Sequence, residues 1–481
     1  EFAYASTALC CPARCQLLTG LYGHNTGVYA NVGEYGGREG FVEPLDEFGH
    51  RLKDESGKCL NHEKRTVAAM LLENANYATG LFGKYLNGIE YGGSWFIPPG
   101  WSDFSSGGDH GLYTGHYYSL YNYREGTKEI TYDWFNFGDE DYMTDVVRDR
   151  TVDFIGRYRS NVTAAQQRPL FMYVAGTAPH FPLPPATRHK KYLDFWDKKF
   201  ESIVASRPNY YNDTDIVGKS EWLRSTAAIR KTWRENPFIR TDFKKRMATL
   251  YAVDEMIEAI YNKLKKSGDH ENTVWVLTSD NGYNLGAHHL LHKMAPYEES
   301  TRIPFYISGP GFPKGKVSKD LVLIQDITPT LLHLAGFEAP SYMDGISLVP
   351  GKSNATAVEL STSRSAVLFE YKSPIASYYN VSLPLEIFPL YRAKNEPGFA
   401  LDMPPYKAIR TKEHLLVDWM YFDPAIREPN RHEFELYDTK EDPYQMRNIY
   451  EKVGGDKSPL VQDLYSKLQK LRFCKGKECN V

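Results

Sequence analysis

Cysteine, long apolar runs and an excess of charge of either sign are all scarce in this sequence. Its six cysteines among 481 residues are too few for a disulfide scaffold. No apolar run approaches the roughly 18 residues that span a bilayer, so no segment is expected to cross a membrane. The 57 basic and 60 acidic residues are interspersed and nearly cancel, which gives no reason to expect a nucleic acid or a membrane surface as partner.

Internal repeats and low-complexity tracts are also absent, which leaves an ordinary globular chain. A hydrophobic content of 42% is enough for a substantial core. In the first 340 residues, β-rich apolar runs alternate with polar loops and amphipathic stretches, the pattern of an α/β architecture. Residues 169–177 and 273–279 are continuous apolar runs bounded by turn signals, as expected for buried parallel strands. Helices are predicted over four amphipathic stretches: 66–74, 146–159, 244–266 and 326–334.

The composition changes after residue 350. Residues 351–362 are rich in Ser, Thr, Ala and Asn, which indicates a linker. Beyond it, the pattern predicts short strands and a closing helix: 367–371, 406–410, 415–419 and 459–472. We therefore expect a large α/β domain over 1–350 and a smaller α+β domain over 363–481. In the smaller domain, Cys474 and Cys479 are close enough in sequence to form a disulfide.

Polar side chains follow both long apolar runs at the points where the predicted strands end. The first run is followed by His180 and the second by Asp280 and Asn281. Ligands of open α/β sheets bind beyond the carboxyl ends of the strands. The Asp-Asn pair offers two hard oxygen ligands, which suit Ca²⁺ or Mg²⁺ rather than zinc. Taken alone, residues 280–282 favour an Asn-Gly turn, and a lone histidine in a proline-rich loop favours a structural role.

The glycine- and tyrosine-rich residues 91–142 show no sustained period. We expect them to form loops and short strands. Such segments carry binding residues more often than the elements they connect, so this stretch is a candidate wall of a cleft.

The stretch that carries most chemical information is Cys10-Cys11-Pro12-Ala13-Arg14. Pro12 suits the first turn of a helix, and the apolar residues and glycines after it predict a helix over 12–21. Cys10 would then lie at the helix N-terminus, where free N–H groups attract oxyanions, and Arg14 would share its face. The pattern predicts a nucleophile in an anion site. The alternative is a structural or metal-binding pair of Cys11 and Cys15.

Residues 8–20, which read ALCCPARCQLLTG, resemble the modification signature of the type I sulfatases. In that family a formylglycine-generating enzyme oxidises the cysteine of a C-x-P-x-R core to formylglycine (3-oxoalanine), and Cys10 matches this cysteine. Lys84 matches the sulfate-binding lysine of the second sulfatase signature. Residues 278–286, which read TSDNGYNLG, resemble the segment that binds the divalent cation. The resemblance covers most of the chain and implies an alkaline-phosphatase-like fold, with a mostly parallel central sheet and helices on both faces.

The resemblance implies an enzyme that hydrolyses sulfuric esters, with a sulfated carbohydrate or an aryl sulfate as substrate. One hydroxyl of hydrated formylglycine at position 10 would attack sulfur, and the second would later expel sulfate. By the same match Arg14, Lys84 and Lys293 would hold the sulfate oxygens. His180 would assist the departing alcohol.

The cation site shows the largest departure from the family. The resemblance implies that Asp280 and Asn281 bind Ca²⁺ or Mg²⁺, which acts as a Lewis acid and positions the reactants. The family adds two consecutive aspartates at the end of a strand upstream of the formylglycine. No residue precedes Glu1 to supply them, and the chain opens without a methionine or a signal peptide. We therefore expect residues 1–481 alone to be inactive or poorly folded, and the full-length parent to be active.

A second departure lies beside Lys84. Many family members place a histidine two residues after this lysine, whereas here Leu86 is followed by Asn87. This form is closer to the N-acetylglucosamine-6-sulfatase and arylsulfatase branch. His24 is a weak substitute, either structural or in contact with substrate, so the general base is not assigned from the sequence.

Two other functions stay open. One is a phosphoester or phosphonate hydrolase on the same fold, although such relatives commonly use serine or threonine as nucleophile. The other is a non-catalytic paralogue that binds sulfated glycans through the same cationic pocket.

The sequence also bears on localisation. Four N-glycosylation sequons suit a chain that passes through a secretory route: Asn161, Asn212, Asn354 and Asn380. We expect a secreted glycoprotein, located outside the cell or in a lysosome.

Overall fold

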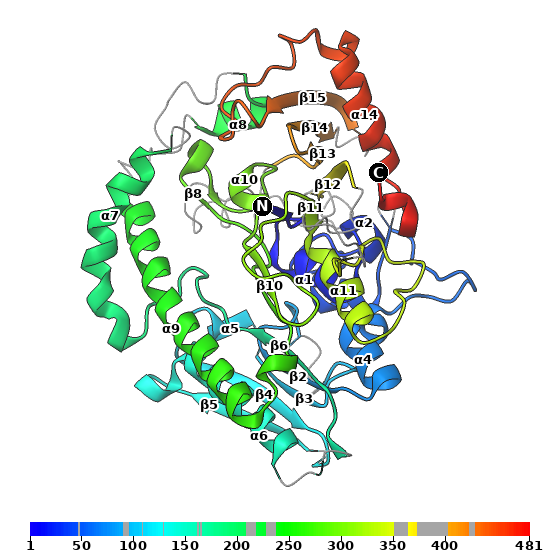
Figure 1. Ribbon diagram of the computed structural model, residues 1–481. Helices are drawn as coiled ribbons and strands as arrows, with labels where there is room; N and C mark the ends of the chain where they lie inside the picture. Colours follow the sequence, from blue (N-terminus) through cyan, green and yellow to red (C-terminus); the bar gives the residue numbers. More distant parts are fainter. Residues whose placement is uncertain are drawn as a thin grey trace, which may run out of the picture.

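A computed structural model of the chain describes most of the 481 residues (Figure 1). The description leaves out 47–48, 90–95, 108, 128, 161–162, 164–165, 208–217, 228–236, 351–363, 373–402 and 423–428. The predicted linker 351–362 and the asparagines of all four sequons lie outside the described residues. Within them, no helix is both long enough and apolar enough to cross a membrane.

The largest sheet has five strands in the order β5-β4-β3-β2-β6. β2 (Ala78–Gly83) is central and runs parallel to both β3 (Asp103–Ser106) and β6 (Leu170–Ala175). β4 (Tyr118–Arg124) and β5 (Ile130–Phe135) extend the sheet in antiparallel pairing. β6 confirms the parallel direction predicted at 169–177, although its residues are only half-buried, and β3 to β5 confirm short strands within 91–142.

The second predicted strand has a different partner. β7 (Trp275–Thr278) pairs antiparallel with β10 (Phe305–Ser308), so the prediction of parallel pairing at 273–279 is wrong. The physical reason is that the chain turns back after β7 and returns beside it, whereas an apolar run carries no information on strand direction. A third pairing, parallel, joins β1 (Phe2–Tyr4) to β11 (Leu321–Leu323).

Helices cover both faces of the strands. On one face, α1 (Cys10–Thr19), α4 (Val67–Ala75) and α11 (Ile327–Leu334) pack into a core that also receives Leu81 and Val276. On the other, α6 (Met143–Arg159) and α9 (Pro237–Ser267) pack on Phe82 and Trp275. β6 and β7 contribute to both cores, so they lie in one layer and their carboxyl ends reach the same region.

The predicted helices are present, with shifted ends. α4 begins where Thr66 Oγ1 accepts a hydrogen bond from Ala69 N. α9 begins at Pro237, earlier than the predicted 244, because proline suits the first helical position and Arg240 pairs there with Asp197. Shorter elements fill the connections: α2 (Gly23–Thr26), α3 (Gly37–Val42), α5 (Asp109–Leu112), α7 (Leu193–Ala205), α8 (Glu221–Ala227), α10 (Glu298–Thr301), β8 (Asn284–Leu285) and β9 (Leu291–His292).

An antiparallel sheet forms the C-terminal part. It contains β12 (Ala366–Tyr371), β13 (Tyr406–Thr411), β14 (His414–Phe422) and β15 (Pro429–Asp438), and α14 (Pro459–Leu471) packs on it. The strands predicted at 367–371, 406–410 and 415–419 and the closing helix are confirmed. This sheet shares one core with β1 and β11, because Tyr4 and Leu321 pack in the same cluster as Trp419.

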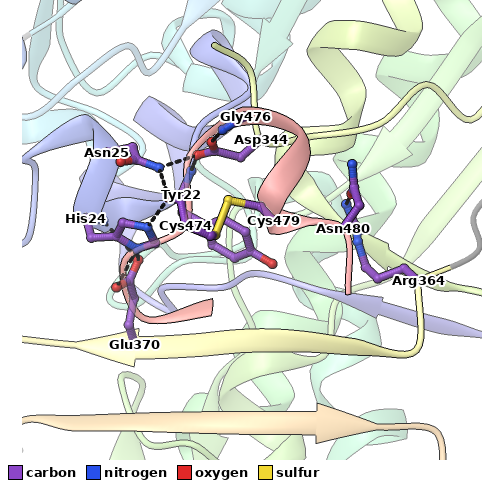
Figure 2. Close-up of a disulfide and its surroundings, with 10 residues drawn as sticks. All are labelled: Tyr22, His24, Asn25, Asp344, Arg364, Glu370, Cys474, Gly476, Cys479 and Asn480. Atoms are coloured by element: carbon purple, nitrogen blue, oxygen red, sulfur yellow. Dashed lines mark hydrogen bonds and ion pairs between the residues drawn. A yellow bond between two sulfur atoms is a disulfide. The ribbon is translucent and has the colours of Figure 1, made fainter. Parts of the chain in front are cut away.

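The predicted disulfide between Cys474 and Cys479 is present. Figure 2 shows that its loop contacts the segment that follows α1. Asn25 Nδ2 donates to the Cys474 carbonyl at 2.8 Å, and Gly476 N donates to Asp344 Oδ1 at 2.7 Å. The C-terminal end of the chain thereby supports the region around α1 and α2.

Candidate functional site

Cys10 is the first residue of α1 and is only 2% exposed. The helix begins two residues before the predicted start, because Leu9 is the extended N-cap and Pro12 fits the first turn. It ends at Thr19 because Gly20 adopts a φ of 76°, the left-handed geometry of a C-cap. Arg14 lies one turn from Cys10, and its Nε donates to the Cys10 carbonyl at 3.0 Å.

Lys293 lies beside the cysteine although it is distant in sequence. It follows β9, and its Nζ lies 2.7 Å from Cys10 Sγ and 3.4 Å from Asn281 Oδ1. Its exposure is 8%, so the ammonium group is held in a largely enclosed position. The structure thus joins Cys10, Lys293 and Asn281, which the sequence proposed for one site.

Asp280 and Asn281 lie just after β7, separated from it by Ser279, and face the same cluster. Asp280 Oδ2 lies 3.6 Å from Arg14 Nε, and Asn281 Nδ2 donates to the Gly282 carbonyl at 2.8 Å. That bond turns the amide oxygen toward Lys293. Their oxygens fit part of the shell of a hard cation, which takes six or more oxygen ligands. Across the described parts of the chain, no group of three or more His, Cys, Asp or Glu side chains is arranged to hold a metal.

Lys84 and His180 both contact the ring of Tyr113, a residue that the sequence did not single out. Lys84 follows β2, and its Nζ lies 4.5 Å from the centre of the Tyr113 ring. The same ring stacks on His180 with centroids 4.2 Å apart. Tyr113 belongs to the tyrosine-rich stretch predicted to wall a cleft, but nothing in the sequence distinguished it from its neighbours.

Two asparagines near α1 were also missed as site residues. Asn87 Oδ1 accepts a hydrogen bond from Arg14 Nη2, and Asn31 Oδ1 accepts one from Cys11 N at 2.9 Å. Asn87 therefore orients the guanidinium group, one residue after the position where many family members have a histidine. Asn31 satisfies one of the free N–H groups at the start of α1.

His24 does not join this cluster in the contacts that the structure describes. Its Nδ1 lies 3.2 Å from both carboxylate oxygens of Glu370, and its Nε2 lies 3.0 Å from the Cys474 carbonyl (Figure 2). Both ring nitrogens are therefore engaged in holding α2 against β12 and the disulfide loop. These contacts favour the structural one of the two roles considered for His24, and the substrate-binding role stays a prediction.

The cationic side chains dominate the electrostatics of the site. Burial raises the pKa of the Cys10 thiol, but Lys293, Lys84 and Arg14 together bring this pKa down to about 6. The pKa of Lys84 is lowered to about 8, mainly by burial and further by the positive charge of Arg14. Burial, Lys293 and Lys84 also hold the pKa of His180 well below its usual value, so its imidazole is neutral at pH 7. The site favours anions and keeps a neutral histidine at its edge.

The lowered pKa of Cys10 makes its alkylation a direct test of the cluster. Because the thiolate is the reactive form, we expect iodoacetamide to modify unconverted Cys10 with a half-maximal rate near pH 6. Lys293→Met removes the nearest cation and should move that midpoint to higher pH. Mass spectrometry of the Cys10 peptide follows the reaction, with exposed Cys59 as internal reference. An unchanged midpoint in Lys293→Met would contradict the close contact between Lys293 Nζ and Cys10 Sγ.

The chain is similar in sequence to proteins of a known family. The family model described as "Sulfatase" matches residues 2–337. An extracellular sulfatase SULF-1 homolog of Drosophila melanogaster is 33% identical over 349 residues, which is 72% of this chain but 28% of that protein. The N-acetylglucosamine-6-sulfatase of Homo sapiens is 30% identical over 509 residues. This match covers 99% of this chain and 79% of the human protein.

A solved structure shows the same fold. It is described as a complex with its substrate D-glucosamine-2-N,6-O-disulfate, and it is 21% identical with a TM-score of 0.65. The match covers 100% of this chain and 90% of that one. The fold predicted from the resemblance is confirmed, and the family match spans the strands and helices that bring Cys10, Lys84, Lys293 and Asp280 together. The chain belongs to the sulfatase family.

Proposed function

We propose that this protein hydrolyses sulfuric esters of sugars, with formylglycine formed from Cys10 as its nucleophile. The observation that carries the proposal is the position of Cys10 Sγ, 2.7 Å from Lys293 Nζ at the N-terminus of α1. Arg14 and Lys84 add two further cations around the same atom. This arrangement suits an anionic sulfate group presented to residue 10.

The substrate class follows from two similarities. The human relative is named as an N-acetylglucosamine-6-sulfatase, and the solved structure holds a 6-O-sulfated glucosamine. We propose a 6-O-sulfated glucosamine unit as the substrate of this chain, with an aryl sulfate as a synthetic alternative.

Two groups would complete the site. Asp280 and Asn281 would hold a divalent cation, Ca²⁺ or Mg²⁺, with further oxygen ligands. The cation would supply Lewis-acid charge, and the hydrated aldehyde of formylglycine would supply the attacking hydroxyl. The carboxylate of Asp280 also lies 3.6 Å from Arg14 Nε, so it holds the guanidinium beside residue 10.

We assign the other steps of the proposed reaction to side chains of this site. Arg14, fixed by Asn87, and Lys293 and Lys84 bind the sulfate oxygens and stabilise negative charge as the S–O bond breaks. His180 is neutral before substrate binds, with Nδ1 directed at the Phe181 carbonyl. An arriving sulfate offsets the charge of the nearby lysines, which favours protonation of His180 at Nε2 and its donation to the leaving oxygen.

The experiment uses the protein from its native source, so that the maturation of Cys10 is its own. We expect release of sulfate from N-acetylglucosamine-6-sulfate to be much faster than release of phosphate from the matching 6-phosphate. Mass spectrometry should find an aldehyde in place of the Cys10 thiol. Faster phosphate release would indicate a phosphoester hydrolase instead. An unmodified thiol, together with sulfated-glycan binding and no turnover, would indicate a non-catalytic binding protein.

We further propose a secreted or lysosomal location for the protein. Disulfides form in oxidising compartments, and the Cys474–Cys479 pair is such a bond. The name of the Drosophila relative includes the word extracellular. Glycosidase treatment of the native protein should lower its mass if the four sequons are used.

A further inference from the structure

Two exposed aromatic rings stack on each other outside the site described above. The centroids of Tyr117 and Phe137 lie 5.5 Å apart, and the ring planes differ by only 9°. Tyr117 is 59% exposed and Phe137 is 76% exposed. Single exposed apolar side chains are ordinary, whereas a gathered pair of rings marks a candidate binding surface.

Sheet topology places this pair at the same edge as the proposed active site. Lys84 follows β2 and His180 lies beyond the end of β6, so both stand at the carboxyl edge of the parallel strands. β4 runs antiparallel to β3, so it begins at that edge, and β5 ends there. Tyr117 directly precedes β4, and Phe137 lies two residues after β5.

The distance along this edge suits a short sugar chain. β4 is two strands away from β2 in the sheet order. β5 is three strands away from β2. With neighbouring strands about 4.8 Å apart, Tyr117 is displaced about 10 Å and Phe137 about 14 Å from the sulfate-binding lysine along the edge. The pair also stands beyond the end of β3, because Ser106 pairs with Tyr121, three residues after the start of β4. Two or three linked sugar rings span such a separation.

The segment that carries Tyr117 is fixed at both ends. Tyr113, four residues earlier, contacts Lys84 and His180 in the site. Tyr117 N donates to the Asn136 carbonyl at 2.9 Å, and Tyr117 adopts a φ of 55°. Left-handed geometry is rare for a bulky residue and is concentrated at functional sites. The ring is therefore presented in a set position rather than on a loose loop.

The charge around the pair differs from that around Cys10. Asp139 and Glu140 follow Phe137 and are exposed. A sulfated or carboxylated ring at this place would meet their carboxylates, which disfavour like charge. An uncharged sugar ring would meet no such cost, and its C–H face can lie flat on an aromatic ring.

We propose that Tyr117 and Phe137 form an outer carbohydrate subsite that stacks on an uncharged sugar of the substrate chain. The sulfated sugar of the same chain would occupy the site at Cys10. This inference rests on the proposed function and narrows its substrate to an oligosaccharide in which the sulfated unit is followed by uncharged units. The subsite determines specificity and takes no part in bond breaking.

The test compares two substrates on the mature protein. One is N-acetylglucosamine-6-sulfate, and the other is a tetrasaccharide that carries this unit at its non-reducing end followed by uncharged sugars. We expect the wild type to prefer the tetrasaccharide in kcat/KM. Tyr117→Ala and Phe137→Ala should each lower this preference by about tenfold, as expected for loss of an aromatic contact. Tyr117→Phe should keep the wild-type preference for the tetrasaccharide, because it keeps the aromatic ring.

Phe195→Ala is the matched control, because Phe195 is an aromatic residue of α7 that is 49% exposed. It should leave the tetrasaccharide preference unchanged. A fully sulfated tetrasaccharide should show no dependence on Tyr117 or Phe137. The proposal is overturned if both alanine variants fold normally and keep the wild-type preference, or if the wild type shows none.

A binding measurement separates this proposal from the proposed function. If no sulfate ester is hydrolysed, the proposed function fails, but an unsulfated tetrasaccharide can still be titrated by NMR. Binding that is lost in Tyr117→Ala supports the subsite, and absence of binding to the wild type overturns it. Sedimentation provides the last check: a dimer that dissociates in Phe137→Ala would assign the pair to contact between copies of this chain instead.

Discussion

Cys10→Ala is expected to lower kcat for sulfate ester hydrolysis by at least about 10³-fold, because removal of a covalent nucleophile leaves only binding and charge stabilisation. The three cations around position 10 remain in the variant, since Arg14, Lys84 and Lys293 are held by contacts besides the cysteine. Affinity for a sulfate ester should therefore change much less than turnover. The measurement is steady-state kinetics on the sulfated sugar combined with equilibrium binding to the inactive variant.

Cys59→Ala is the matched control for this loss. Cys59 is exposed, whereas Cys10 is the buried first residue of α1. Its replacement should leave kcat at the wild-type value. Substantial turnover by Cys10→Ala would show that another group is the nucleophile. A loss of substrate binding as large as the loss of turnover would instead show that the variant disrupts the anion site.

The sequence singled out several candidate site residues, but it did not predict the side-chain contacts that hold them in position. Cys10 and Arg14 were predictable because helix spacing alone places them together. Asp280 and His180 follow predicted strand ends, but only the resemblance to the sulfatases singled them out, because taken alone they favoured a turn and a structural histidine. Asn87 and Tyr113 were not, because their roles depend on contacts with Arg14, Lys84 and His180 that only tertiary packing creates.

The fold shows the same division between local and long-range information. Apolar periodicity placed β6, β7 and most of the long helices, because a buried face has a local pattern. It did not give the antiparallel pairing of β7 with β10, which depends on where the chain returns. The composition of 351–362 predicts a domain boundary, whereas the C-terminal sheet shares its core with β1 and β11. Unfolding of the two parts should therefore be coupled.

Arg364→Met is expected to lower the free energy of unfolding by about 3–5 kcal/mol, the cost of leaving a buried charge without its partner. Arg364 precedes β12, and its guanidinium binds both oxygens of Asp326 at 2.8 and 3.0 Å. Both side chains are completely buried. Asp326 also accepts hydrogen bonds from Leu323 N and Ile346 N, so it stays in place when the arginine is removed. The pair thus links the start of α11 to the start of β12.

A double-mutant cycle isolates this interaction from simple loss of packing. Asp326→Asn keeps an acceptor for the two backbone N–H groups but removes the charge, so combining it with Arg364→Met should recover part of the stability lost in Arg364→Met. Urea unfolding followed by circular dichroism gives the four free energies. Lys467→Met, which breaks the exposed Lys467–Asp463 pair, should cost less than about 1 kcal/mol. Additive losses in the cycle would mean that the interaction between Arg364 and Asp326 adds nothing to the free energy of unfolding. Packing alone would then couple the C-terminal sheet to the rest of the chain.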